Sequence, residues 1–312
     1  MLKICSFLPA VTQMMCDMGL QEYVHGITFE CPQQALSEKE IVVRCILEGK
    51  AYSSHEIDRL FSASKRDGKS LYYVEERILE AIAPDIIFTQ DVCDVCQIDT
   101  ECTAAAVAHL PKQPELISIT PASLQDVFEN ALTIARALKR ENAGIAYVDV
   151  LNEQLNDIDR LLNSAAVQTK EVLLLEWIDP IFNCGHWIPH QIERAGGIDR
   201  LSRPAGDSTV IDWSAVVAYN PEILVIAPCG FTIARTLKEM HLLTEKPEWS
   251  SLRAVQNNAV YIADFDLFTQ SSAHTLTRGI TLLAALFHPG VVAIPENLVR
   301  KFVRFSEKVI HN

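Results

Sequence analysis

The sequence lacks any apolar run near the roughly 20 residues that a membrane-spanning helix needs. It also lacks the basic start, apolar stretch and cleavage site of a secretory signal, because Met1–Pro9 is short, carries one lysine and reaches proline at once. Its net charge of −13 repels phosphate backbones and anionic lipid. These absences predict a cytosolic protein that inserts into no membrane and binds no nucleic acid.

Familiar catalytic motifs are missing as well. The chain contains no GxSxG elbow, P-loop, GxGxxG or HExxH sequence. Glu176 and Asp179 form a possible carboxylate pair, but sequence alone gives no separation between them. We therefore assign no catalytic residue, and the sequence favours a binding protein over an enzyme.

Cysteines are few for a disulfide-stabilised protein. There are nine in 312 residues, well below the roughly 8–10% of disulfide scaffolds. In the predicted reducing compartment, their thiols are expected to be free or bound to metal.

What the sequence does contain is an alternation of strand-like and helical patterns in its first and last thirds. The composition, 49% apolar and 21% charged, is typical of a globular protein. Strands separated by helices pair in parallel, so we expect an α/β fold. The predicted strands are Lys3–Leu8, Tyr23–Phe29, Asp85–Thr89, Leu116–Ile119, Glu171–Trp177, Ile223–Pro228 and Val260–Ala263.

The middle of the chain is helical. Leu124–Leu138 carries a clear apolar stripe, and after a polar break a second helix runs to about Ala165. At 1.5 Å per residue, about 24 residues span about 36 Å, which suggests one long rigid helix. We therefore predict two Rossmann-like lobes with a ligand cleft between them: residues 1–121, a helical connection over 122–168, and residues 169–312.

Candidate ligand-binding residues follow the predicted strands, because ligands of open parallel sheets lie beyond the carboxyl ends of the strands. Trp177, Trp187 and Phe231 offer flat apolar walls for a large planar ligand. The nearby acids, with Arg235 and Arg278 as the plausible arginines, favour a neutral, cationic or hydroxyl- and amide-rich ligand. The candidates are Phe7, Pro9, Glu30, Asp91, Glu176, Trp177, His186, Trp187 and Phe231.

Four cysteines form a candidate metal site. The spacing Cys93-x-x-Cys96 allows two thiolates to bind one metal, and Cys31 and Cys229 follow other predicted strands. Such a set suits zinc or an iron–sulfur cluster. The alternative, that these cysteines are small residues packed in turns, remains open.

Several segments of the chain resemble the class III periplasmic binding proteins (TroA-like, iron and vitamin B12 type), and within them the cobalamin-binding branch. The resemblance covers essentially the whole chain. It is carried by SFLPAVTQMMCDMGL, PDIIFTQDVCDVC, LEWIDPIFNCGHWIPHQIERAGG, PEILVIAPCGF and PEWSSLRAVQNNAVYIADFDLF.

The resemblance implies two α/β lobes joined by a long helix and a bound cobalamin, haem or iron chelate that is delivered to an ABC transporter. It places the cleft loops at Ser6–Pro9, Glu30–Cys31, Asp91–Cys96, Glu176–Trp177, Gly185–Trp187 and Cys229–Phe231. The chain departs from the family in lacking a signal peptide and in its cysteine-rich loops.

Three hypotheses follow from the sequence. The first is a cytosolic protein that binds a corrinoid or another planar or metal-containing small molecule. The second is a metal- or Fe-S-dependent enzyme or sensor that uses the four cysteines. The third is an exported component of an ABC importer.

Overall fold

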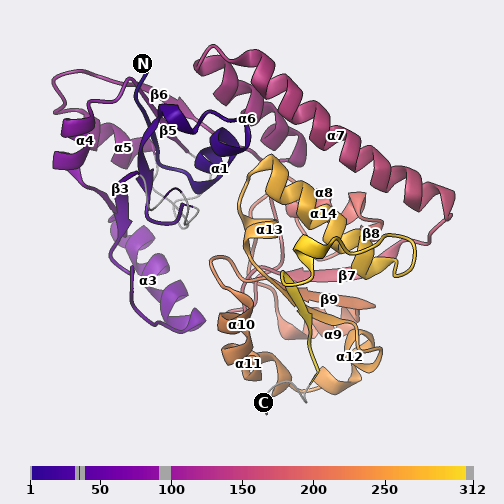
Figure 1. Ribbon diagram of the computed structural model, residues 1–312. Helices are drawn as coiled ribbons and strands as arrows, with labels where there is room; N and C mark the ends of the chain where they lie inside the picture. The colour runs from indigo at the N-terminus through magenta and orange to yellow at the C-terminus, as the bar shows by residue number, and fades with distance from the viewer. Residues whose placement is uncertain (1, 32–34, 36–38, 91–99, 307–312) are drawn as a thin grey trace. The chain divides into compact units, whose positions relative to one another are not determined.

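The structure is a computed structural model that describes residues 2–31, 35, 39–90 and 100–306 (Figure 1). The chain forms two compact units. The first comprises Met1–Tyr52, Glu56–Pro121 and Gln125–Val150, and the second comprises Ser53–His55, Ala122–Leu124 and Leu151–Asn312.

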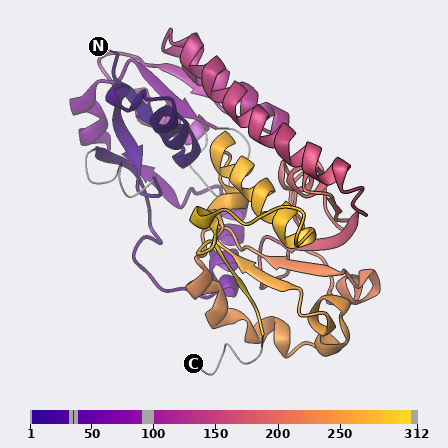
Figure 2. The same cartoon turned by 45° about the vertical axis from the view of Figure 1, so that its right-hand side comes forward.

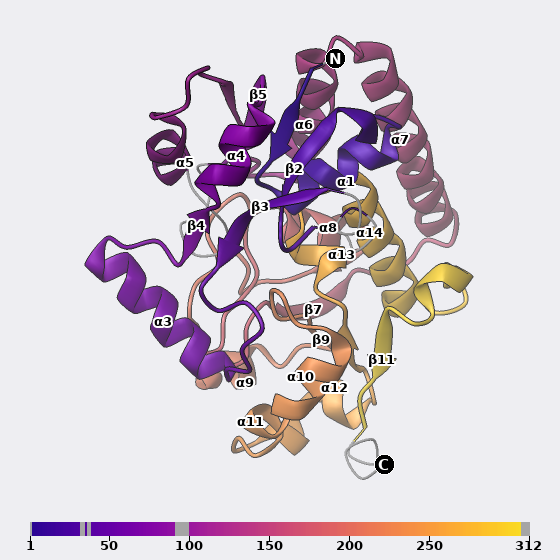
Figure 3. The same cartoon turned by 60° about the vertical axis from the view of Figure 1, so that its left-hand side comes forward.

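The first unit is built on a six-stranded sheet in the order β4-β3-β2-β1-β5-β6. Neighbouring strands are parallel except β3 and β4. Figure 3 shows helix α1 on one face of this sheet and α4 and α5 on the other. The strands are β1 (Ile4–Ser6), β2 (Val24–Thr28), β3 (Glu40–Cys45), β4 (Tyr72–Val74), β5 (Ile86–Thr89) and β6 (Glu115–Ser118). The helices are α1 (Pro9–Asp17), η1 (Gln21–Tyr23), α3 (Ser54–Asp67, whose first two residues belong to the second unit), α4 (Glu76–Ile82) and α5 (Thr100–Val107).

Helices α6 (Leu124–Ala137) and α7 (Glu141–Ser164) follow the first sheet. Between them Lys139 takes a positive φ of 57°, which ends the first helix at the predicted polar break. The start of α7 is tied to the first unit, because Arg140 donates to the Tyr23 hydroxyl at 2.7 Å and Tyr147 to Asp17 at 3.2 Å. Figure 2 shows α7 as one unbroken helix.

The second unit has a five-stranded sheet in the order β11-β10-β9-β7-β8. Only β10 and β11 run antiparallel among its described pairs. Helices α8 and α14 pack together on one face, and α9 and α12 lie on the other (Figure 1). The strands are β7 (Lys170–Leu175), β8 (Gly197–Ile198), β9 (Ile223–Ile226), β10 (Val260–Ala263) and β11 (Phe302–Arg304). The helices are α8 (Ile188–Arg194), α9 (Trp213–Tyr219), α10 (Ile233–Glu239), α11 (His241–Thr244), η2 (Trp249–Ser251), α12 (Arg253–Gln256), α13 (Asp266–Thr269), α14 (Ala273–Phe287) and η3 (Glu296–Leu298).

Each unit has its own apolar core. In the first, Cys5, Val42 and Ile87 belong to one cluster of buried side chains from neighbouring strands. In the second, Leu173, Leu224 and Ile262 come from the three central strands and have no exposed surface. Burial on both faces is what central parallel strands covered by helices require.

The predicted α/β class with two mainly parallel sheets is confirmed. Within the described residues no helix combines the length and apolarity needed to span a bilayer. The domain boundaries at 121/122 and 168/169, the cleft and the rigidity of the long helix stay predictions.

Candidate functional site

An aromatic pair lies beyond the carboxyl ends of two neighbouring strands of the second unit. β7 and β9 are parallel and adjacent, so the residues that follow them meet at one edge of the sheet. The Trp177 and Phe231 rings are 4.9 Å apart between centroids and tilted by 54°. The Cys229 N–H donates to the Glu176 carbonyl at 3.0 Å and joins the two loops. Both aromatic residues were predicted as ligand walls, and the structure brings them together.

Trp177 remains partly accessible, whereas Phe231 is buried. The Trp177 indole N–H lies 3.2 Å from the Asp179 carbonyl and 3.3 Å from that of Ser54, which belongs to the same unit. These hydrogen bonds fix the orientation of the indole ring. The pair therefore forms a fixed aromatic surface with one accessible ring.

An arginine lies over the Phe231 ring. Thr232 caps α10 by accepting the backbone N–H of Arg235, and the guanidinium carbon of Arg235 is 4.6 Å from the Phe231 centroid. One turn later Glu239, buried to 6% exposure, binds the same guanidinium. The Glu239 carboxylate also accepts the Ser54 N–H at 3.1–3.2 Å. Arg235 was noted from sequence; the buried Glu239 was missed.

The loop after β7 is held against the segment around Gly206. The Ser208 hydroxyl donates to the Glu176 carboxylate, the His186 N–H donates to the Gly206 carbonyl at 2.7 Å, and the Ala205 N–H donates to the His186 carbonyl at 2.9 Å. A Cβ at Gly185 would lie 2.4 Å from the Gly206 carbonyl oxygen. The close approach of the two backbones therefore requires glycine at position 185.

His186 takes a positive φ of 50° and has an 18% exposed side chain. Burial lowers the pKa of its imidazole, and Asp207, whose carboxylate is 3.9 Å away, partly opposes this shift. A neutral imidazole retains one nitrogen able to accept a hydrogen bond or bind a metal. The predicted role of His186 in ligand binding stays a prediction.

Three other candidates have structural positions. Trp187 is 8% exposed and donates its indole N–H to the Phe268 carbonyl at 2.6 Å, so it packs in the core beside α13. Phe7 is 1% exposed and belongs to the core of the first unit. Pro9 is buried at the first turn of α1. Their predicted contacts with a ligand stay predictions.

The remaining acidic candidates lie in the first unit. Glu30 follows β2 and its side chain reaches solvent, yet the surrounding protein removes part of its hydration and raises the pKa of its carboxyl to about 7. Asp91 lies outside the described residues. Their predicted roles in binding stay predictions.

The structure does not test the predicted four-cysteine metal site. Cys93 and Cys96 lie outside the described residues, and Cys31 and Cys229 belong to different units. Cys31 donates its thiol to the Thr12 hydroxyl at 3.1 Å, and burial raises its pKa to about 12. Among the residues that the structure does describe, no three His, Cys, Asp or Glu side chains are grouped to hold a metal. Zinc or iron–sulfur binding therefore stays a prediction.

Sequence reasoning also missed Asp199, a carboxylate that supports the loop after β7. It is 8% exposed and accepts the N–H groups of Leu174 at 3.0 Å and Leu201 at 2.9 Å. The buried Cys184 thiol points to it at 3.6 Å. Burial raises the pKa of Asp199 to about 6, although these donors lower it. The tertiary contacts that define this role have no signal in the sequence.

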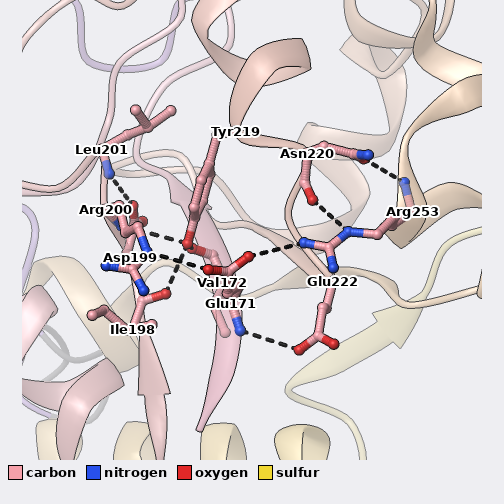
Figure 4. A network of polar contacts seen from close by, with 10 residues as sticks. All are labelled: Glu171, Val172, Ile198, Asp199, Arg200, Leu201, Tyr219, Asn220, Glu222 and Arg253. Carbon is pink, nitrogen blue, oxygen red and sulfur yellow. Dashed lines mark hydrogen bonds and ion pairs between the residues drawn. The ribbon is translucent and has the colours of Figure 1, made fainter.

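A second polar network lies at the amino end of β7 (Figure 4). The Glu171 carboxylate binds Arg200 at 3.2 Å and Arg253 at 3.0 Å. The Tyr219 hydroxyl is 2.9–3.0 Å from carbonyls of β7 and β8, and burial raises its pKa to about 12. Because this network joins the strands away from the aromatic pair, its role is structural.

Two α/β units, each built on a mainly parallel sheet, are the architecture of two-lobed binding proteins. The family model described as periplasmic binding protein matches residues 76–267, more than half of the 312 residues. The chain belongs to this family.

Solved structures of similar fold cover nearly the whole chain. A periplasmic binding protein from Veillonella parvula has a TM-score of 0.68 and 14% identity over 92% of this chain and 90% of its own. The periplasmic haem-binding protein RhuT from Roseiflexus sp. has a TM-score of 0.68 and 16% identity, over 93% of this chain and 99% of its own. The periplasmic vitamin B12-binding protein BtuF of Vibrio cholerae has a TM-score of 0.60 and 15% identity, over 91% of this chain and 96% of its own. No curated protein matches the chain.

The family overturns the prediction of a cytosolic location. Its members are periplasmic binding proteins, and the similar structures include further periplasmic ones. The prediction of a cytosolic location was therefore wrong.

Proposed function

We propose that this protein is the substrate-binding component of an ABC importer and holds a corrinoid or another planar, metal-containing small molecule. The observation that carries the proposal is the Trp177–Phe231 pair at the ends of β7 and β9. Similar folds described as binding vitamin B12 or haem support this ligand class. Both ligands are large macrocycles with an extended flat face, which suits aromatic stacking.

Three side chains would each have a different role in holding the ligand. Trp177 would stack on the macrocycle, with Phe231 fixing the indole from behind. His186, held neutral by burial, would offer a ring nitrogen to a polar edge or to the metal of the ligand. The alternative of a cysteine-dependent metalloenzyme gains no support from the described residues.

The test is a titration of the purified protein with cyanocobalamin, haemin and a ferric hydroxamate, followed by tryptophan fluorescence and visible absorbance. We expect saturable binding of at least one of these. Trp177→Ala should weaken binding by about 10- to 100-fold, or roughly 1.4–2.7 kcal/mol, because the stacking surface is lost. Trp177→Phe should recover much of this loss.

Trp213→Ala is the matched control. Trp213 is also partly buried, but it stacks on Trp249 and donates to the Pro247 carbonyl, away from the ends of β7 and β9. We expect this variant to bind as the wild type does. Absence of binding to all three ligands, or unchanged affinity in Trp177→Ala, would refute the proposed function.

A further inference from the structure

The aromatic pair has a cation beside it. The Arg235 guanidinium carbon is 4.6 Å from the Phe231 centroid, and the Phe231 centroid is 4.9 Å from that of Trp177. The Phe231 ring therefore contacts both the guanidinium and the indole. A positive charge so close to a partly desolvated aromatic surface would attract anionic groups on any molecule that stacks there.

Glu239 cancels that charge. It follows Arg235 by one helical turn, and the two side chains form an ion pair in which the carboxylate is 7% exposed and the guanidinium 29%. The same carboxylate accepts the Ser54 N–H. Because Glu239 is buried and doubly bonded, it remains close to the guanidinium and leaves it little charge to offer a ligand.

The neighbouring loop reinforces this effect. Glu176 and Asp179 flank Trp177 in sequence, and the Trp177 indole donates to the Asp179 carbonyl. Asp207 lies on the segment that packs against Gly185 and is 83% exposed. These carboxylates add negative charge near the aromatic surface and would oppose the approach of an anion.

We propose that Glu239 is a specificity-determining residue that acts by pairing with Arg235, the arginine over the Phe231 ring. This pairing makes the aromatic site prefer neutral or cationic planar metal complexes over their carboxylate-bearing counterparts. This inference rests on the proposed function. It concerns the charge of the ligand rather than its shape. Glu239 acts through Arg235 and Phe231, and so it is a positioning residue.

The experiment compares ligands that differ in charge but share a macrocycle. One pair is haemin dimethyl ester and haemin; the other is cyanocobalamin and its monocarboxylate derivative, in which one side-chain amide is hydrolysed. Dissociation constants are measured for both forms of each macrocycle that the wild type binds. The wild type should prefer the form without the free carboxylate, and Glu239→Gln should shift the ratio of the two constants at least tenfold towards the carboxylate form.

The double variant Arg235→Gln/Glu239→Gln is the matched control. It removes both charges and should return the ratio towards that of the wild type, which a merely structural role of Glu239 would not produce. Using a ratio cancels any general loss of affinity from altered packing, and circular dichroism verifies that each variant is folded.

The outcomes separate the two proposals. Wild type that binds neither macrocycle overturns this inference, and if it does not bind the ferric hydroxamate either, the proposed function is overturned as well. Wild type that binds a macrocycle, with the same ratio in Glu239→Gln, overturns the charge selectivity alone. A ratio shifted equally in the single and the double variant also overturns it, because the effect would then not depend on the Arg235 charge.

Discussion

Asp199 shows at the scale of one residue how a buried carboxylate is accommodated. Its oxygens accept two backbone N–H groups and face the Cys184 thiol, and the Tyr219 phenol also interacts with it. Burial still raises the pKa of Asp199 to about 6, and burial with the nearby carboxylates raises that of Cys184. The cost of removing the charge from water exceeds the gain from these donors.

Asp199 should make stability depend on pH. Its carboxyl has an ordinary pKa of 3.8, which the fold raises to about 6, so the folded protein binds this proton more tightly than the unfolded chain. Between these values the free energy of unfolding should therefore fall as pH rises, by roughly 2–3 kcal/mol. Asp199→Asn should reduce the slope by this contribution, measured by urea unfolding at pH 4.5, 5.5 and 6.5, and the slope that remains should include the contribution of Glu30, whose carboxyl pKa the fold also raises.

The control for this prediction is Asp207→Asn, which changes a carboxylate that is 83% exposed. It should keep the slope of the wild type. Parallel curves of stability against pH for the wild type and Asp199→Asn would contradict the assignment.

The loop after β7 is the element on which the aromatic site depends. A Cβ at Gly185 would meet backbone atoms of Gly206, Asp207 and Ser208 at 2.4–2.8 Å. Backbone cannot yield as a flexible side chain can, so Gly185→Ala should destabilise the protein by about 1–3 kcal/mol. It should also weaken ligand binding, because the loop that carries Trp177 and His186 would be displaced.

Gly206→Ala is the control within the same pair of segments. Its added Cβ would find its nearest atoms at 3.7 Å, in Arg203, so the expected change is within about 0.5 kcal/mol. The stability of both variants is measured by thermal unfolding, and their affinity by ligand titration. Similar losses in the two variants would show that the close approach at Gly185 is not what holds the loop.

Strong periodic patterns allowed much of the fold to be predicted at this scale. The predicted strand Val260–Ala263 coincides with β10, and the predicted helix Leu124–Leu138 matches α6 to within one residue. Strands β4 and β11 were not predicted from the sequence, because three residues are too few to show a hydrophobic period. β3 was also not predicted, although it has six residues, because charged Glu40 and Arg44 interrupt its apolar pattern.

The candidate site was only partly predictable. Trp177 and Phe231 lie at the ends of strands that the sequence predicts from their apolar runs. Because neighbouring parallel strands end at the same edge of a sheet, the two residues could be expected to lie close together. The Arg235–Glu239 spacing is that of an ordinary exposed ion pair, and only tertiary packing buries Glu239. Trp187 looks like Trp177 in sequence, yet its hydrogen bond to the Phe268 carbonyl places it in the core.

Net charge is a property of the whole molecule, and at −13 it should repel anionic ligands during their approach. The Debye length falls from about 30 Å at 0.01 M salt to about 8 Å at 0.15 M. The association rate of haemin should therefore rise about two- to tenfold over this range, measured by stopped-flow absorbance. The rate for neutral cyanocobalamin should change little, and a haemin rate that falls with salt would contradict the prediction.

The edges of the second sheet have a consequence for solubility. β10 is apolar and fully buried, and β11 covers its outer side with an antiparallel ladder over Phe302, Val303 and Arg304. β8 ends the other side after two residues. Short edge strands offer few free backbone groups to a strand from another molecule. An apolar sheet of this kind is thereby protected from aggregation through its edges, even at high protein concentration.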